Sequence, residues 1–367
     1  MISILASGKE SLKFLNGFRQ IISPKDVDLN VIVDTFDFFD FYDIRIYPQL
    51  TNVVLLFMNQ LNENKWTGKI NDTHEISTFL QDVDEKFPSV KELYEVGDLY
   101  LAPNIFIDFH RKNSHPLSEC ITEFTEKITE AAIIPLSNDE LKQELNSKEL
   151  SNAEGFNEPK NSKNTMFDEF ESITLSNEAK EAILESELII IPKPPIVSIL
   201  AFLKISKFQE VLKDAVGQII FISPIKEKEL DSTSLLAFQE ARLPPSSIGL
   251  TKALRGLVDI YVIDTIEAPL KNRITRYGTK VVSYPLNLDT TKTQLEVAEF
   301  VLKLTPLKEI VESLEYKAKK EVASLKQGLR KLVGGLKRIK SRPTSSKEDY
   351  KEEDTEKEKE DAVDNES

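Results

Sequence analysis

Short apolar segments alternate with helix-like segments along the first 300 residues, and this alternation is the strongest constraint on the fold. The apolar segments are rich in β-branched residues, as buried strands are. The segments between them carry apolar residues three and four positions apart, which indicates amphipathic helices. Parallel strands need a crossover between them, and the crossover is usually a helix. The sequence therefore predicts an α/β fold, a three-layer and mostly parallel Rossmann-like sheet.

The predicted strands are the apolar runs at 1–5, 30–33, 105–109, 133–136, 188–191, 218–222, 260–263 and 280–282. The predicted helices are 11–22, 51–61, 117–128, 177–186, 206–212, 251–257 and 293–304. A polar stretch at about 140–175 breaks the alternation and is expected to form an insertion. Residues 1–305 are thus predicted to form one α/β domain.

Charge divides the rest of the chain into two parts. Residues 317–342 carry ten Lys or Arg and one acid, whereas 343–367 carry eleven acids and four lysines. We expect a basic amphipathic helix over 306–340 and a disordered acidic tail over 341–367. The helix could dock on its own domain, pair with another chain, or lie on an anionic membrane surface through 317–340. The net charge of −14 argues against nucleic acid as a partner.

The sequence also bears on location. No apolar run approaches the length of roughly 18–20 residues that a membrane-spanning helix needs, and the start lacks the layout of a signal peptide. A single cysteine, Cys120, fits a reducing compartment. The expected location is the cytoplasm.

An acidic and aromatic stretch follows the second predicted strand: residues 31–48 read VIVDTFDFFDFYDIRIYP. In α/β folds the residues that follow a strand build the ligand site, which makes Asp34 and Thr35 candidate ligand-binding residues. Asp37 and Asp40 are candidate ligands for a metal ion, or partners for a hydroxyl group. Solvated turn residues are the alternative for both.

The turn after the first strand contains Ser7, Gly8, Lys9 and Glu10. A glycine at this position lets backbone N–H groups approach a phosphate at a helix N-terminus. The segment has one glycine, however, and the Glu10 carboxylate is expected to repel a phosphate. An ordinary strand-to-helix turn is the favoured interpretation.

These motifs, taken in order, resemble the 2-phospho-L-lactate transferase family, whose members attach 2-phospholactate to a deazaflavin in making a deazaflavin coenzyme. The resemblance covers roughly the first 300 residues. Its matching segments are 4–9, 34–40, 43–52, 66–73, 97–104, 135–139, 187–199, 222–228 and 261–264.

The resemblance implies a reaction: transfer of a 2-phospholactyl group from a guanylyl pyrophosphate donor to a deazaflavin hydroxyl, with magnesium held by carboxylates. It implies Asp37 and Asp40 as metal ligands. The residues that it implies for ligand binding are Gly8, Asp34, Thr35, Asp72, Thr73, Gly97, Asp98 and Ser198. Helix capping or turn formation is the structural alternative for the last five.

The chain departs from the family pattern at several of these segments. Most glycines of the first loop are missing, Ile107 stands in place of an arginine, and Lys193-Pro194 replaces Ser-Asn. Loss of one donor aimed at a transition-state charge typically costs roughly 10²–10³ in rate. Two hypotheses stay open: a divergent transferase, and a non-catalytic paralogue, or pseudoenzyme, that binds a nucleotide, a nucleotide-sugar or a protein partner. The departures favour the second.

Overall fold

The computed structural model describes residues 1–25, 27–41, 43–83, 97–141, 167–225 and 230–305. The chain divides into two units, Met1–Val311 and Glu312–Ser367, and all of the described residues belong to the first. The predicted basic helix at 306–340 and the predicted tail at 341–367 lie outside the described residues. So does much of the predicted insertion, at 142–166.

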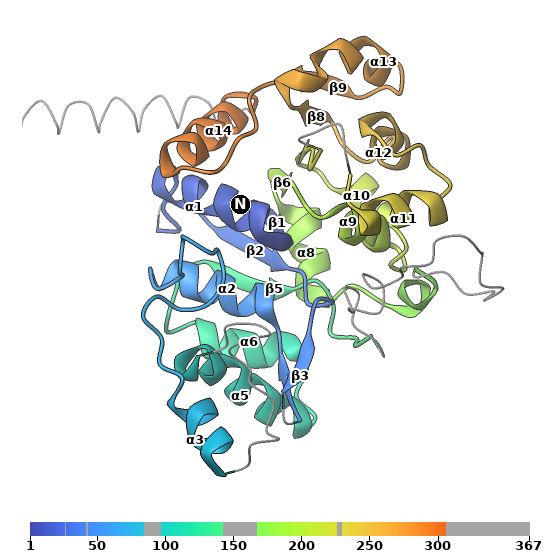
Figure 1. Cartoon of the computed structure of the whole chain (residues 1–367). Helices are drawn as coiled ribbons and strands as arrows, with labels where there is room; N and C mark the ends of the chain where they lie inside the picture. Colours follow the sequence, from blue (N-terminus) through green and yellow to red (C-terminus); the bar gives the residue numbers. More distant parts are fainter. Residues whose placement is uncertain (26, 42, 84–96, 142–166, 226–229, 306–367) are drawn as a thin grey trace, which may run out of the picture. The chain divides into compact units, whose positions relative to one another are not determined.

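A seven-stranded sheet forms the centre of the first unit (Figure 1). All of its neighbouring strands run parallel, in the order β5-β2-β1-β6-β7-β8-β9. Its strands are β1 (Ile2–Ala6), β2 (Leu29–Val33), β5 (Ala132–Pro135), β6 (Leu188–Pro192), β7 (Gln218–Ile222), β8 (Ile260–Ile263) and β9 (Lys280–Ser283). A separate antiparallel hairpin consists of β3 (Phe39–Phe41) and β4 (Ile44–Ile46).

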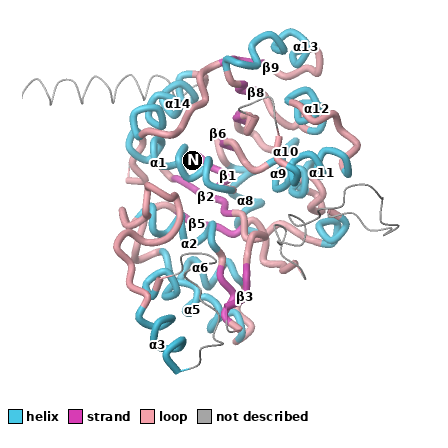
Figure 2. Tube along the Cα trace, viewed as in Figure 1, coloured by secondary structure: helices cyan, strands magenta, loops and turns pink. Residues whose placement is uncertain are grey.

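Helices flank the sheet (Figure 2). The connection from β1 to β2 crosses the sheet in one direction, and the connection from β5 to β6 crosses it in the opposite direction. Because both crossovers are right-handed, α1 and α8 lie on opposite faces of the sheet. The three-layer α/β prediction is confirmed. The helices are α1 (Gly8–Ile21), α2 (Pro48–Phe57), α3 (Glu75–Val83), α5 (Asp98–Lys112), α6 (Leu117–Thr125), α8 (Asn177–Glu185), α9 (Ile196–Phe202), α10 (Phe208–Asp214), α11 (Ser232–Glu240), α12 (Ser247–Ala253), α13 (Lys271–Thr275) and α14 (Thr291–Lys303), with 3₁₀ turns at Asp168–Ser172 and Thr265–Leu270.

Helix α14 packs along α1, which joins the last described helix to the first. The two backbones approach closely at Gly17, where a Cβ atom would lie 2.3 Å from the carbonyl oxygen of Gln294. A buried hydrogen bond of 2.9 Å from Asn16 Nδ2 to Gln294 Oε1 fixes the contact. Glycine is therefore required at position 17 by packing.

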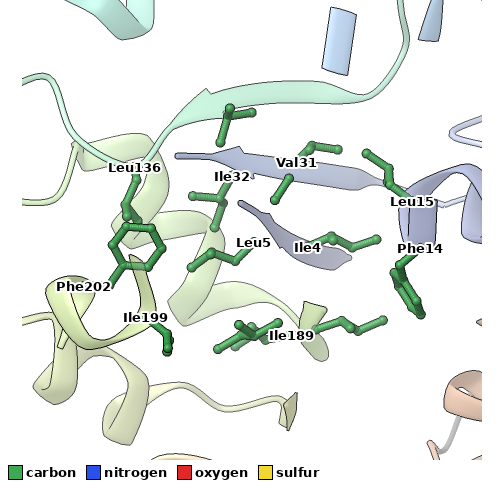
Figure 3. Close-up of a cluster of buried hydrophobic side chains, with 14 of the residues drawn as sticks. Ile4, Leu5, Phe14, Leu15, Val31, Ile32, Leu136, Ile189, Ile199 and Phe202 are labelled. Atoms are coloured by element: carbon green, nitrogen blue, oxygen red, sulfur yellow. The ribbon is translucent and has the colours of Figure 1, made fainter. Parts of the chain in front are cut away.

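The hydrophobic core surrounds the three central strands (Figure 3). Every residue of β1, β2 and β6 is buried, as expected of parallel strands covered on both faces. The core residues labelled in Figure 3 come from these strands, from α1 and α9, and from the end of β5: Ile4, Leu5, Val31, Ile32, Ile189, Phe14, Leu15, Ile199, Phe202 and Leu136.

One predicted strand is wrong. Residues 105–109 lie inside α5, although four of these five side chains are apolar, as in a strand. A short apolar run cannot by itself distinguish a strand from a buried helix segment. In α5 the buried positions include Leu101, Asn104, Ile107 and Asp108, which have helical spacing. The other seven predicted strands correspond to the seven strands of the sheet.

The end of the predicted polar insertion packs on the body of the unit. Phe167, Phe170 and Ile173 are buried, and the Phe170 ring lies 5.1 Å from that of Phe36, edge to face. Phe36 belongs to the acidic and aromatic stretch, and its ring is part of the hydrophobic core.

None of the described helices is long and apolar enough to cross a membrane.

Candidate functional site

A pocket of about 480 Å³ opens at the carboxyl ends of β1, β6 and β7. Between β1 and β6 the strand order reverses, and in open parallel sheets ligands bind at such a switch point. We call this space the crevice pocket. It is lined by Gly8, Lys9, Glu10, Lys193, Pro194, Pro195, Ile196, Val197, Pro224, Ile225, Leu230, Asp231, Thr233 and Ser234.

Gly8 begins α1 at the wall of the crevice pocket. Its φ of +72° belongs to the left-handed region, and a Cβ atom at this position would lie 2.7 Å from Pro195 Cγ. The loop after β1 and the loop after β6 can thus approach each other only because residue 8 is glycine.

Two lysines compensate the charge of Glu10 in the first turn of α1. Glu10 Oε1 accepts a hydrogen bond of 2.9 Å from Lys13 Nζ, and Glu10 Oε2 lies 3.8 Å from Lys193 Nζ. The Lys193 side chain is fully buried and donates to the carbonyl oxygen of Leu286 at 2.9 Å. Lys13 also pairs with Asp289 at 2.9 Å. The charge of Glu10 is therefore balanced, contrary to the simple repulsion expected from the sequence.

Asp34 lies at the end of β2 and is almost fully buried. Its Oδ2 accepts a hydrogen bond of 2.7 Å from Ser7 Oγ, and its Oδ1 accepts one of 2.9 Å from the Phe36 amide. Burial raises the pKa of Asp34 to about 6 despite the hydrogen bonds from Ser7, Phe36 and Ser198. Predicted residues Asp34 and Ser198 are thus brought together, one strand away from the crevice pocket. Thr35 is buried next to them.

Asp40 is exposed on the β3–β4 hairpin, where Arg45 binds both of its carboxylate oxygens at 2.8 and 3.0 Å. These hydrogen bonds lower the pKa of Asp40. Arg45 also pairs with Glu140 at 2.9 Å, so Asp40 belongs to a network of ion pairs.

Burial raises the pKa of both Asp34 and Tyr100, and the nearby charge of Asp37 adds to the rise of each. The resemblance places acids of the family at Gln49 and Thr51, and here neither residue supplies a carboxylate. Within the described residues no group of three His, Cys, Asp or Glu side chains is placed to hold a metal ion. The residues present do not fit a carboxylate-bound magnesium site, and the metal roles of Asp37 and Asp40 stay a prediction.

Asp98 caps the N-terminus of α3. Its Oδ2 accepts hydrogen bonds from Thr73 Oγ1 at 2.6 Å and from the Glu75 amide at 2.9 Å, and its Oδ1 accepts one from the Ile76 amide at 3.1 Å. Burial raises the pKa of Asp98, but these hydrogen bonds outweigh it and leave the pKa lowered.

Asp72 in turn caps the N-terminus of α5. Its carboxylate accepts hydrogen bonds from the Leu99 amide at 3.0 Å and from the Tyr100 amide at 2.9 Å. A Cβ atom at Gly97 would lie 2.3 Å from the Asp72 carboxylate, so the cap requires glycine there. Asp72, Thr73, Gly97 and Asp98 thus form a reciprocal cap between two helices, which accounts for these four residues structurally. Their ligand role stays a prediction.

The sequence-based site left out Lys193, which was noted only as a substitution in the loop after β6. Its position between a buried strand and two prolines was the feature that could have identified it. Lys193 has a φ of +49° and lines the crevice pocket. Ile107, at the expected arginine position, is fully buried in α5 and packs in the hydrophobic core.

An open parallel sheet with a pocket over its switch point defines the class: an α/β protein with a ligand crevice at the strand ends. Within this class, a model of the family 2-phospho-L-lactate transferase CofD matches residues 101–303, more than half of the chain. The chain belongs to this family.

Similar proteins come from methanogenic archaea. The 2-phospho-L-lactate transferase of Methanococcus maripaludis strain C5 is 28% identical over 287 residues, which cover 74% of this chain and 89% of the relative. The transferase of Methanocaldococcus jannaschii is 25% identical over 288 residues, or 75% and 89% of the two chains. That of Methanosarcina acetivorans is 24% identical over 313 residues, or 82% and 98%.

Proposed function

We propose that this chain is a ligand-binding member of the 2-phospho-L-lactate transferase family that takes a nucleotide-type phosphate ester in its crevice pocket. The observation that carries the proposal is the pocket itself, because it combines a switch-point position with the first turn of α1 and the exposed Lys9.

The electrostatics of the pocket support an anionic ligand. Helix α1 has 14 residues, and its N-terminus carries the positive end of the helix dipole. The N-cap residue Ser7 makes no side-chain cap bond, which leaves first-turn amides to a ligand. Lys9 is exposed at the same turn, and the charge of Glu10 is balanced by Lys13 and Lys193.

The bonding of the remaining acids supports binding without rapid group transfer. Transfer from a pyrophosphate donor needs developing charge to be neutralised, commonly by a cation held by carboxylates. Asp40 is paired with Arg45, and the acids that the family pattern places after Pro48 are Gln49 and Thr51 here. Pro194 has no backbone N–H to donate from the loop after β6.

Transfer itself is the second candidate function. It is favoured by the family match and by the names of the similar proteins, all of which are 2-phospho-L-lactate transferases. The chain would then move a 2-phospholactyl group from a guanylyl pyrophosphate donor to a deazaflavin hydroxyl in coenzyme biosynthesis. The pyrophosphate bond would break, and GMP would leave with the proton of the hydroxyl group.

A thermal melting screen with GDP, GMP, a nucleotide-sugar and a deazaflavin, each with magnesium or EDTA, tests the binding proposal. A ligand that binds the folded protein raises the melting temperature by mass action. We expect GDP to raise it in both conditions, and Lys9→Glu to weaken the effect. Lys180→Glu, on the exposed side of α8, is the matched control and should leave it unchanged.

Absence of a shift with every compound would contradict the proposed function. Mass spectrometry after incubation with the donor and the deazaflavin tests the second candidate. Formation of the phospholactylated product at the rate of an active relative would make this chain an enzyme, and the binding-only proposal would be wrong.

A further inference from the structure

We propose that the exposed side of α5 is the contact surface of a homodimer, in which a second copy of this chain packs its own α5 antiparallel against it. The surface belongs to the two helices that the reciprocal cap joins, α3 and α5. None of its residues lines the crevice pocket, so the proposal does not depend on the proposed function.

The exposed side of α5 is entirely apolar over about three turns. Between residues 99 and 109 the exposed side chains are Leu99, Ala102, Ile105 and Phe109, and none of them is polar. They lie within an arc of about 120° on the helix surface, because successive residues are about 100° apart. Other sides of α5 pack on α2, β4 and α6. We call these four residues the α5 stripe.

Helix α3 carries a second apolar stripe. Ile76, Phe79 and Val83 are exposed and lie three and four residues apart, so they share one side of α3. The two helices begin side by side, since Asp98 accepts a hydrogen bond from the Ile76 amide and Asp72 accepts one from an amide of α5. Figure 1 draws both helices at the same end of the unit. The reciprocal cap therefore brings the first residues of the two stripes together.

The exposed apolar area of the two stripes is large enough for a dimer. Val83, Phe79 and Phe109 are 71%, 68% and 64% exposed, and the other three large side chains are between 44% and 54% exposed. Side chains of this size then leave about 500 Å² of apolar surface in contact with water. A standard interface buries about 800 Å² on each partner, of which roughly 60% is apolar. The stripes thus supply the apolar part of one such interface.

The charges around the stripes favour a second copy over a lipid surface. Glu75 and Asp82 are exposed beside the α3 stripe, and Asp72 and Asp98 lie at the N-terminal end of α5. An anionic membrane surface attracts basic segments and would repel these acids.

The same charges favour the antiparallel direction. At the C-terminal end of α5, Arg111 and Lys112 form ion pairs with Asp108, and Arg111 also pairs with Glu140, so charges of both signs are balanced there. A parallel copy would bring two acidic ends together, whereas an antiparallel copy places each acidic end beside a balanced one. Opposed helix dipoles favour the same direction. The contact is then isologous, as in most symmetric dimers.

Light scattering during gel filtration tests the proposal. At about 10 µM, where a dimer with a micromolar dissociation constant forms, the unmodified chain should have close to twice its mass of 41.7 kDa. Phe109→Glu should have the mass of one chain, because the dimer would bury two unpaired carboxylates. Leu235→Glu, which changes an exposed leucine of α11, is the matched control and should stay dimeric. A monomeric unmodified chain, or a dimeric Phe109→Glu variant, would overturn the proposal.

A pair of charge variants tests whether the stripe packs on its own copy. Ala102 lies in the middle of the α5 stripe, so Ala102→Glu and Ala102→Lys should each be monomeric through repulsion between like charges. An equal mixture of the two variants should recover dimers at low salt, since opposite charges then meet. A mixture that stays monomeric would mean that the stripe does not contact a second copy around Ala102.

Two further measurements distinguish the other ways in which the stripe could be covered. If circular dichroism shows that Phe109→Glu is unfolded, the side chain is needed within one chain and the proposal is wrong. Flotation with vesicles that contain anionic lipid tests a membrane. A monomeric chain that binds the vesicles, and loses this binding in Phe109→Glu, would replace the dimer by a lipid surface.

Discussion

Aspartates have different structural roles in two regions of this molecule. In the segment that contains α3 and α5, Asp98 and Asp72 fill two helix N-termini with carboxylate oxygens. At the end of β2, Asp34 instead accepts hydrogen bonds from the Ser7 hydroxyl and the Phe36 amide. The difference separates acids that cap helices from a buried acid that joins the loops after β1 and β2.

The comparison also shows that a match to a family motif can have a purely structural cause. A Gly-Asp pair that matches a family motif can be retained because two helices need it, since Gly97 makes room for Asp72. Asp34 belongs to a different matching segment, directly after the buried strand β2. Its surroundings explain why the position requires a polar side chain, since Ser7 and the Phe36 amide both need an acceptor.

The largest effect is expected from Gly97→Ala, which breaks the reciprocal cap. The new methyl group would overlap the Asp72 carboxylate, so the free energy of unfolding should fall by about 3–4 kcal/mol from overpacking and cap loss together. Urea unfolding measures it. Gly97 has a φ of −93°, which alanine adopts freely, so backbone strain does not contribute. Asp72→Ala is the control, because adding Gly97→Ala to it should cost little once the carboxylate is gone. A double variant that is far less stable than Asp72→Ala would mean that overlap with Asp72 does not explain the effect.

The next effect is a pH dependence at Asp34. Its pKa is about 6 in the folded protein against an ordinary 3.8, so the folded state prefers the protonated acid. Stability from this group is therefore highest below pH 4 and is lost as the pH rises to 6. The shift corresponds to about 3 kcal/mol. Asp34→Asn does not ionise, so its unfolding free energy minus that of the unmodified chain should rise by this amount from pH 3 to pH 7. Chemical denaturation across that range would contradict the idea if the difference stayed constant.

A smaller effect is expected when either cap is removed alone. Asp72→Ala and Asp98→Ala should each lower the free energy of unfolding by about 1–2 kcal/mol, the usual range for loss of a cap. Amide exchange should rise at Tyr100 in the first variant and at Ile76 in the second. Affinity for GDP should not change in either variant. A weaker affinity would return these residues to the ligand site.

The smallest effect is expected at the hairpin. Asp40→Ala removes an exposed ion pair with Arg45, and exposed pairs contribute about 0–1 kcal/mol. Arg45 keeps its contact with Glu140, which limits the loss further. Melting of the variant with and without magnesium provides the second measurement. A magnesium-dependent shift that disappears with Asp40 would support the metal role predicted from the sequence.

Much of the fold could be predicted because burial on both faces makes central strands uniformly apolar. The segments at 188–191 and 218–222 are predicted as strands, and both are strands of the sheet. The segment at 105–109 is apolar at four of five positions, but it lies in a 15-residue helix in which Ile107 and Asp108 are buried and Ile105 and Phe109 are exposed. Composition alone does not separate a short strand from part of a helix.

The candidate site could be predicted only in part. Gly8 and Asp34 follow buried strands; that position indicated Asp34, whereas Gly8 was implied by the family resemblance. The partners of Glu10 could not be foreseen, because Lys193 and Asp289 are distant in the sequence and meet it only through the order of the strands. The reciprocal caps formed by Asp72 and Asp98 likewise depend on the relative orientation of two helices. The spacing of residues in the sequence does not predict that orientation.

The close contact of α14 with α1 has a consequence for how the chain is made. Helix α1 is synthesised before its partner residue Gln294, which comes nearly 280 residues later in the chain. Contacts between residues so far apart in sequence form slowly. Until then the side of α1 that faces α14 must stay exposed or be shielded by a chaperone. A nascent chain that stops before Thr291 would lack the partner of α1, so the core on this side of α1 can close only after α14 has been synthesised.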